Sequence, residues 1–202
     1  LAANLSDVAA MGCEPLSAVI TMGLRGDLPV DGLVELYRGM AEASRRYATA
    51  LVGGDIVGSP VFFLAVSVVG ASAGGGDGPA AGGPLLTRRS AVGGDVVAVT
   101  GSLGCSAAGL RMAQSGLRFD GATEAHLRDA HNRPAPRLAE GSLIARNGVT
   151  TAIDVSDGLV DDLGKVCNSS GVGARVYSHR VPADRFLRRA FADDWMALAL
   201  TG

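Results

Sequence analysis

The sequence predicts an α/β or α+β protein built in two parts, and two observations support this. Strand-like apolar segments alternate with amphipathic helical segments in both halves of the 202-residue chain. Between the halves, residues 71–84 are almost entirely Gly, Ala, Ser and Pro, which predicts an exposed loop or connector. We therefore expect an N-terminal domain at 1–75, a connector at 76–92 and a C-terminal α/β domain at 93–202. The order of elements alone does not decide whether the sheets are parallel.

The first half is expected to contain two helices and three strands. The clearest helix is 30–47, whose inward stripe repeats at helical spacing: Leu33, Leu36, Tyr37, Met40, Ser44 and Tyr47. Residues 53–55 (GGD) are expected to end the strand that begins at Ala50, because two glycines follow its apolar residues. The expected order is a helix at 4–11, a strand at 16–22, the helix at 30–47, and strands at 50–52 and 61–69.

The second half is expected to alternate in the same way. An exposed segment at 120–133 precedes a helix at 136–146, where Pro136 suits the first turn. A second helix begins near Leu159, since apolar residues recur from there at helical spacing. The remaining expected elements are strands at 96–100, 151–153, 174–177 and 196–200, and a helix at 106–114.

Composition favours small-molecule chemistry in a reducing compartment. The chain is 48% hydrophobic and 19% charged with a net charge of −2, which allows a real core and does not favour a nucleic-acid surface. Cys13, Cys105 and Cys167 are widely spaced, which indicates buried thiols rather than disulfides or a zinc motif. The longest apolar run, 61–69, is too short to span a bilayer, so we expect a soluble cytoplasmic protein with no membrane partner. The chain starts at Leu1 without an initiator methionine and reads as an excerpt.

The most informative stretch is 153–160 (IDVSDGLV), where two carboxylates and a hydroxyl lie between an apolar segment and a helix. In one interpretation Ser156 or Asp157 caps the helix. That interpretation leaves Asp154 without a role. In the other, the acids hold a hard divalent cation such as Mg²⁺, which binds carboxylates and shares them with substrate phosphates. The residues alone leave both interpretations open.

The other candidate binding residues give weaker evidence when each is considered alone. Asp55 follows two glycines that would let the backbone approach a ligand, although an ordinary turn is an equal alternative. Asp7, near a helix start, would ordinarily be a cap or a solvated residue. Arg88 suits a phosphate, as arginine generally does. Residues 101–104 (GSLG) have the shape of an anion-binding turn but lack a P-loop lysine, so a packing turn is favoured.

Six segments in order resemble the motifs of the thiamine-monophosphate kinase family. This family shares an ATP-binding superfamily with aminoimidazole ribonucleotide synthetase, selenide water dikinase and the hydrogenase maturation factor. The segments extend over essentially the whole chain: 4–12 (NLSDVAAMG), 52–55 (VGGD), 86–88 (LTR), 97–101 (VAVTG), 136–141 (PRLAEG) and 152–159 (AIDVSDGL).

The resemblance implies a two-domain aminoimidazole ribonucleotide synthetase-like fold whose N-terminal domain pairs in a homodimeric β-barrel. It implies that ATP phosphorylates thiamine monophosphate to thiamine diphosphate, a phosphotransferase reaction with a phosphate group as acceptor and no protein general base. Such transfer needs positioning and charge neutralisation rather than covalent participation. By residue matching, Mg²⁺ would be bound by Asp7, Asp55, Asp154 and Asp157, and ATP by Tyr37, Gly54, Asp55, Arg88 and Ser156.

The chain departs from the family at three places. Ile56 and Val57 stand where the family usually has two threonines, which puts hydroxyl contacts there in doubt. The N-terminal Gly-Asp-Asp-Ala stretch and the Gly-Glu-Asp-Tyr-Glu-Leu stretch of the family are absent, so part of the metal site and much of the thiamine site would lie outside this excerpt. Two alternatives therefore stay open: a superfamily enzyme acting on selenide or a formylglycinamidine ribonucleotide, and a nucleotide-binding member that has lost catalysis.

Overall fold

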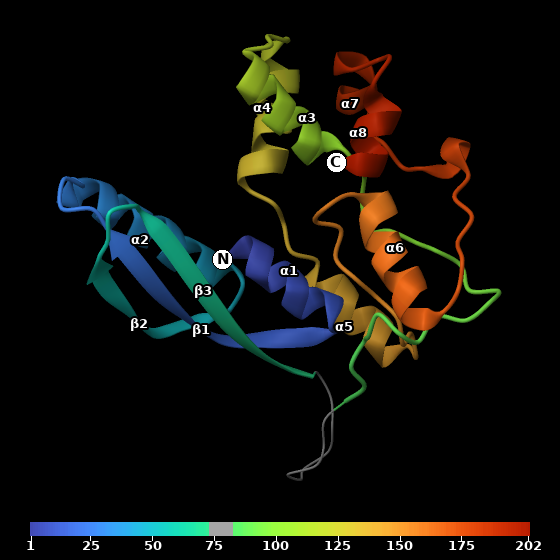
Figure 1. Cartoon of the computed structure of the whole chain (residues 1–202), viewed down its shortest axis with the longest axis horizontal. Coiled ribbons are helices and arrows are strands. Elements are labelled where there is room, and N and C mark those ends of the chain that lie inside the picture. The colour runs from blue at the N-terminus through green and yellow to red at the C-terminus, as the bar shows by residue number, and fades with distance from the viewer. Residues whose placement is uncertain (73–82) are drawn as a thin grey trace. The chain divides into compact units, whose positions relative to one another are not determined.

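The computed structural model describes residues 1–72 and 83–202 (Figure 1). Most of the Gly-rich segment expected at 71–84 lies outside the described residues. The chain divides into two compact units, each described by itself. The first unit is Leu1–Leu85 together with Leu138–Gly148, and the second is Leu86–Arg137 together with Val149–Gly202.

The described residues of the first unit form a three-stranded sheet and three helices, and the five elements expected in the first half are confirmed in type and order. The strands lie in the order β2-β1-β3, with β1 parallel to β2 and antiparallel to β3. The elements are α1 (Ala2–Ala10), β1 (Cys13–Leu24), α2 (Val30–Arg46), β2 (Ala50–Gly58), β3 (Phe63–Ser72) and α5 (Leu138–Arg146).

The core of this unit lies between the sheet and α2. Alternate residues of β1, Ile20 and Met22, are buried against Met40 of α2, as the side-chain period of two in a strand requires. Helix α1 packs on β1 and β3, and the side-chain amide of Asn4 donates to the Val66 carbonyl at 3.2 Å. Helix α5 packs on α1 so closely that a Cβ at Gly141 would lie 2.1 Å from a backbone oxygen.

The prediction that residues 53–55 end the second strand is wrong. Strand β2 continues to Gly58, and the β1–β2 register pairs Ile20 with Gly54 and Thr21 with Asp55. Strand β1 offers ladder partners to β2 from Ala50 to Gly58, so the pairing overrides the poor strand propensity of the two glycines. Gly54 therefore permits a close approach between strands inside the sheet, since an added Cβ there would meet the Ile20 backbone.

The second unit is mainly helical. Its core gathers buried residues from several helices and the segments between them: Leu103, Cys105, Ala108, Met112, Leu127, Leu159, Val181, Leu187, Phe191 and Ala199. Its elements are α3 (Cys105–Ser115), α4 (Gly121–Asn132), α6 (Leu159–Ser170), the 3₁₀ turn η1 (Ser178–Arg180), α7 (Arg185–Ala190) and α8 (Trp195–Thr201). The helices expected at 106–114, at 136–146 and from Leu159 are confirmed.

Two segments of the second half are helices where the sequence predicted another structure, and α7 is a further helix that the sequence did not predict. Residues 120–133, expected as an exposed segment, form α4, where Asp120 caps the helix by accepting from the Thr123 N–H at 3.1 Å. Only a narrow face of α4 is buried, and Leu127 lies on it. The rest of the helix is polar, and for this reason the sequence predicted an exposed segment. Residues 196–200, expected as a strand, lie in α8, whose Ala199 packs beside Gly104.

The strands expected at 96–100, 151–153 and 174–177 do not form in the described chain. Of these residues only Thr151 pairs, in an isolated parallel bridge to Thr87. The apolar residues of these segments suggested buried strands. Two of them are exposed instead: Val96 is 90% exposed and Val176 is 42% exposed. A strand needs a paired strand for its backbone groups, and in the described residues no strand pairs with 96–100 or 174–177, while 151–153 has only the single bridge to Thr87. No helix in the described residues has the length and apolarity needed to cross a membrane.

Candidate functional site

The candidate site of the second unit is built around the turn 154–158, which precedes α6. The turn is anchored upstream by the Thr87–Thr151 bridge, in which the Thr87 N–H donates to the Thr150 carbonyl at 3.0 Å and the Ala152 N–H donates to the Thr87 carbonyl at 3.2 Å. Arg88 directly follows this bridge on one segment, and Asp154 follows it by three residues on the other. The bridge thus brings two predicted site residues onto adjacent segments.

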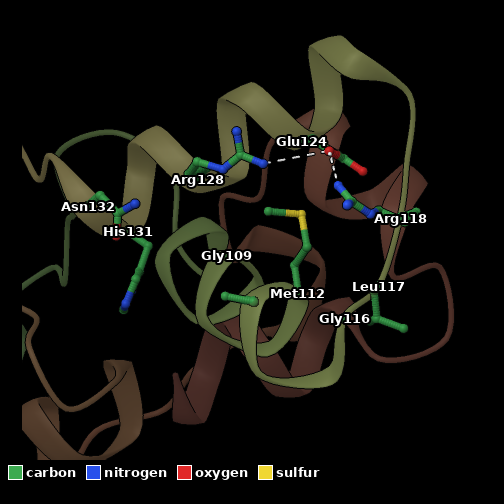
Figure 2. Close-up of a pocket in the computed structure, with 10 residues that line it drawn as sticks. Gly109, Met112, Gly116, Leu117, Arg118, Glu124, Arg128, His131 and Asn132 are labelled. Carbon is green, nitrogen blue, oxygen red and sulfur yellow. Dashed lines mark hydrogen bonds and ion pairs between the residues drawn. The ribbon is translucent and has the colours of Figure 1, made fainter.

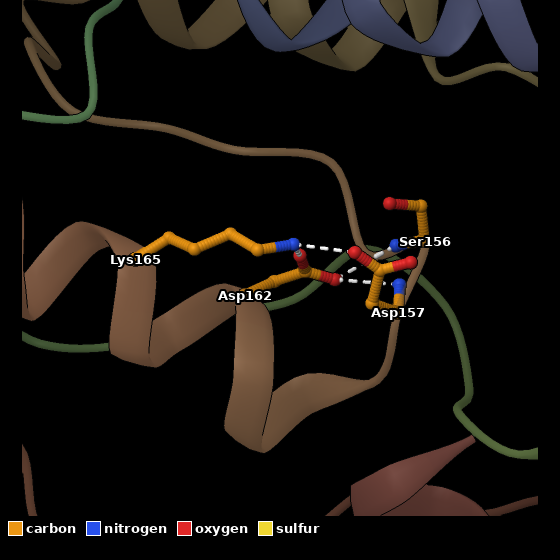
Figure 3. A network of polar contacts seen from close by, with 4 residues as sticks. All are labelled: Ser156, Asp157, Asp162 and Lys165. Atoms are coloured by element: carbon orange, nitrogen blue, oxygen red, sulfur yellow. Dashed lines mark hydrogen bonds and ion pairs between the residues drawn. The ribbon is translucent and has the colours of Figure 1, made fainter.

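A buried carboxylate, Asp162 of α6, holds the turn in shape (Figure 3). Its Oδ2 accepts from the Ser156 N–H at 2.8 Å and from the Asp157 N–H at 3.0 Å. Asp162 is only 1% exposed, whereas Ser156 and Asp157 are exposed. The buried acid therefore fixes the backbone of the turn and leaves the side chains of the two predicted site residues at the surface.

Lys165 completes this network one turn further along α6. Its Nζ donates to Asp162 Oδ1 at 2.7 Å and to Asp157 Oδ2 at 2.5 Å. Burial raises the pKa of Asp162, but the hydrogen bonds from Lys165 and the backbone N–H groups of Asp157 and Ser156 outweigh it and leave the pKa below its usual value. Hydrogen bonds to Asp157 and Asp162 raise the pKa of Lys165. The network is thus an ion pair, with one Asp157 oxygen engaged by lysine.

The helix-cap interpretation of Ser156 and Asp157 is wrong. The N-cap position of α6 is Gly158, at φ 107°, and no side chain makes a cap hydrogen bond there. A Cβ at Gly158 would lie 2.8 Å from the Thr201 carbonyl carbon, so the position also requires a residue without a side chain. Because neither candidate serves as a cap, the acids of this turn need another explanation.

The first unit carries the other predicted residues, on three elements. Asp7 is exposed on α1, and Tyr37 of α2 is 44% exposed rather than part of the inward stripe. Gly54 and Asp55 lie in β2, where Asp55 is exposed and its Oδ1 accepts from the Ile56 N–H at 2.8 Å. A Cβ at Gly54 would lie 1.9 Å from the Ile20 carbonyl oxygen. Gly54 is therefore what permits the strand pairing beside Asp55.

Asp162 and Lys165 are site residues that the sequence reasoning missed. Leu159 and Val166 are buried on the inner face of α6, and Asp162 lies on the same face at i+3 from Leu159. An acid on the apolar face of a helix signals a buried polar network, because an unpaired buried charge is costly. That pattern was available in the sequence. The partners of the carboxylate were not.

Two further features of the second unit do not belong to the candidate site. At Gly104, φ is 89° and an added Cβ would lie 2.7 Å from Leu187, which supports the packing-turn interpretation of 101–104. A pocket of about 320 Å³ lies beside α3 and α4 (Figure 2). Its two guanidinium groups both pair with Glu124, at 3.4 Å for Arg118 and 3.6 Å for Arg128, and it contains no predicted site residue.

Comparison with known proteins connects these features to one family. The model of the AIR synthase related protein N-terminal domain matches residues 1–72, and that of its C-terminal domain matches residues 93–198. Among curated relatives, the thiamine-monophosphate kinase of Salmonella typhimurium is 37% identical over all of this chain and 59% of its own length. That of Mycobacterium tuberculosis is 35% identical over 92% of this chain and 52% of its own length.

Solved structures agree. The structure described as AaThiL complexed with AMPPCP and TMP superposes with a TM-score of 0.89 at 30% identity, covering all of this chain and 62% of that one. The thiamine-monophosphate kinase of Stenotrophomonas maltophilia gives a TM-score of 0.88 at 33% identity, again over all of this chain and 62% of that one. The present chain thus spans about three fifths of the length of these relatives. The two-domain fold and the predicted resemblance to thiamine-monophosphate kinases are confirmed, and the chain belongs to the AIR synthase related protein family.

Proposed function

We propose that this chain is part of a thiamine-monophosphate kinase, which transfers the γ-phosphoryl group of ATP to thiamine monophosphate. The observation that carries the proposal is the turn 154–158, where Asp162 fixes the backbone and exposes a hydroxyl and a carboxylate that the cap interpretation cannot explain. Similarity to thiamine-monophosphate kinases along the whole chain supports the substrate assignment. Free cysteines at all three positions are consistent with action in the cytoplasm.

The residues suit a Mg²⁺-nucleotide site. Exposed or half-buried carboxylates are the hard oxygen ligands that Mg²⁺ requires, and Mg²⁺ would neutralise charge on the phosphate oxygens. Arg88 adds a fixed positive charge, and Gly54, like Arg88, is exposed. The proposed metal ligands are Asp7, Asp55, Asp154 and Asp157, and the proposed ATP contacts are Tyr37, Gly54, Asp55, Arg88 and Ser156.

Phosphoryl transfer would then depend on positioning. The attacking atom is an oxygen of the substrate's own phosphate, so the protein need not supply a nucleophile or a general base. The Asp162 network would hold Ser156 against the nucleotide without reorganisation during the reaction. Lys165 engages one oxygen of Asp157, and the Asp157 side chain is still 62% exposed.

A homodimer is part of the proposal. Val19, Val57 and Phe63 share one face of the sheet, because Gly23 pairs with both Val57 and Phe63 and lies four residues after Val19. Their exposed fractions are 42%, 40% and 40%, and α2 covers the opposite face. Pairing of this apolar face with a second copy would bury it, in the way that the resemblance to the family implies for its N-terminal domain.

A nucleotide-binding protein without transferase activity is the second candidate. It is favoured by Ile56 and Val57, which are 53% and 40% exposed where the family usually presents threonine hydroxyls. Such a protein would bind ATP with Mg²⁺ and form no thiamine diphosphate.

The decisive experiment uses the complete gene product with ATP, Mg²⁺ and thiamine monophosphate. We expect thiamine diphosphate in stoichiometric balance with ADP. Formation of ADP alone, or ATP binding without turnover, would show that the substrate assignment is wrong. Selenide and formylglycinamidine ribonucleotide serve as competing substrates in parallel reactions.

The Asp154→Asn variant tests the metal role within that assay. Removing a metal ligand should lower kcat by about 10²-fold or more while the melting temperature changes little, because a carboxylate that neutralises phosphate charge matters to the transition state. Asp193→Asn, an exposed acid outside the site, is the matched control and should retain full activity. If Asp154→Asn instead unfolds and its native fraction stays fully active, Asp154 is a structural residue.

A further inference from the structure

Three side chains that the proposed kinase site does not use converge in the second unit. The Sγ of Cys105, the ring of His126 and the carboxylate of Asp184 have ligand atoms that all lie within 4.8 Å of one another. Asp184 Oδ2 accepts from Cys105 Sγ at 3.2 Å and lies 2.6 Å from His126 Nε2. A thiol, an imidazole and a carboxylate together are a mixed ligand set of the kind that binds zinc.

Each ligand is held by its own element. Cys105 is the first residue of α3 and is buried, and Asp184 is the N-cap of α7, where its Oδ1 accepts from the Leu187 N–H at 2.9 Å. His126 belongs to α4, and its ring stacks on Phe186 with centroids 4.4 Å apart. Because the cap uses Oδ1, Asp184 Oδ2 is available to a cation without loss of the cap. The stacked ring keeps Nε2 directed at the same point.

The cluster also has access to solvent. The side chain of His126 is 40% exposed and that of Asp184 is 23% exposed, so an ion can enter and a water can supply a fourth ligand. Tetrahedral Zn²⁺ with bonds of about 2.0–2.3 Å places its ligands roughly 3.3–3.7 Å apart. The Cys105–Asp184 separation is close to that range. The His126–Asp184 separation would widen by roughly 0.7 Å, which a small tilt of the exposed ring provides.

We propose that Cys105, His126 and Asp184 form a binding site for a thiophilic divalent cation, represented by Zn²⁺, that is separate from the Mg²⁺ chemistry of the kinase. Thiolate and imidazole ligands select zinc-like ions over Mg²⁺, which prefers oxygen ligands only. The ion would tie together the starts of α3 and α7 and the middle of α4. Its charge would be balanced by one thiolate and one carboxylate.

Binding releases a proton. Burial and the neighbouring Asp184 carboxylate raise the pKa of the Cys105 thiol to about 12, so without an ion the group is a neutral thiol. On coordination the S–H bond breaks, a sulfur–metal bond forms with the electron pair of sulfur, and the proton passes to solvent. No oxidant or reductant takes part.

Cobalt provides a direct probe, because Co²⁺ replaces Zn²⁺ and a cobalt–thiolate bond absorbs in the near ultraviolet whereas cobalt on carboxylates does not. The reduced, chelator-treated full chain is titrated with Co²⁺. We expect a charge-transfer band that saturates at one equivalent, disappears when Zn²⁺ is added and is unaffected by Mg²⁺. The readout is independent of phosphoryl transfer, so its failure would leave the kinase proposal standing.

Matched variants assign the ligands. Cys105→Ser should lose the band, whereas Cys167→Ser should keep it. His126→Gln should weaken Co²⁺ binding ~10-fold or more, whereas His131→Gln, on the same helix, should bind as the parent does. If Cys105→Ser fails to fold, the two histidine variants decide the question. Absence of the band, its persistence in Cys105→Ser, or unchanged affinity in His126→Gln would overturn the proposal.

Discussion

Asp162 shows how a single buried charge can organise a surface site. Its carboxylate has three donors, the Ser156 and Asp157 N–H groups and the Lys165 ammonium, so its burial does not leave an unpaired charge. The acids at 154 and 157 and the hydroxyl at 156 could be predicted from their position between an apolar segment and a helix. The role of Asp162 could not, because sequence spacing does not show that a side chain reaches backward to the preceding turn.

Replacing Asp162 by Asn should therefore affect both stability and turnover. The amide keeps one acceptor but loses the charge that Lys165 and the two N–H groups bind, so we expect a loss of about 2 kcal/mol in the free energy of unfolding and a lower kcat. Denaturant unfolding and kinase assays on the same preparations measure the two effects. Asp161→Asn, the exposed neighbour, should change stability by less than about 0.5 kcal/mol. If Asp162→Asn is as stable as the parent, the turn 154–158 keeps its conformation without this carboxylate.

The difference in unfolding free energy between the parent and Asp162→Asn should become smaller as the pH falls. The pKa of Asp162 lies below its usual value in the folded chain, so the ionised group contributes stability above the unfolded pKa of about 3.9. That contribution is lost as pH falls through the lower folded pKa. The unfolding free energies of the parent and Asp162→Asn should therefore converge below about pH 4 and differ fully at neutral pH.

At the scale of elements, strand β2 shows a tertiary contact overriding local propensity. Its two glycines predicted an end at 53–55, yet pairing with β1 carries the strand through Asp55 to Gly58. Helices with a wide apolar face, such as α2 and α6, could be predicted from periodicity. Helix α4 could not, because so much of its surface is polar, and α8 could not, because a seven-residue apolar helix has the composition of a buried strand.

Gly54→Ala tests the close approach that this pairing needs. The new Cβ would lie 1.9 Å from the Ile20 carbonyl oxygen, a backbone atom that cannot move without breaking the ladder. We expect a loss of roughly 3 kcal/mol or more in unfolding free energy and weaker nucleotide binding, since Asp55 is next in the strand. Gly53→Ala is the matched control, because nothing lies within 4 Å of its Cβ. Equal stability of the two variants would contradict the pairing argument.

At the scale of the whole molecule, the open face of the sheet is the feature that the chain alone leaves unexplained. Monomeric proteins rarely expose a large contiguous apolar patch, and exposed strand edges invite pairing with another chain. In the first unit both features occur together, since β2 and β3 are the outer strands of a three-stranded sheet and Val19, Val57 and Phe63 are exposed on one face. Hydrophobicity predicted the strands. The free face became evident only from their pairing.

Self-association through this face gives the last prediction. Val57→Lys places a charge where two copies would meet, and a buried unpaired charge is costly, so the variant should be monomeric under conditions in which the parent is a dimer. Sedimentation velocity over a concentration series measures the change. Val96→Lys is the control, because Val96 is more exposed, at 90%, and lies in the second unit. The Val96→Lys variant should dimerise as the parent does. A Val57→Lys chain that dimerises as tightly as the parent would place the interface elsewhere.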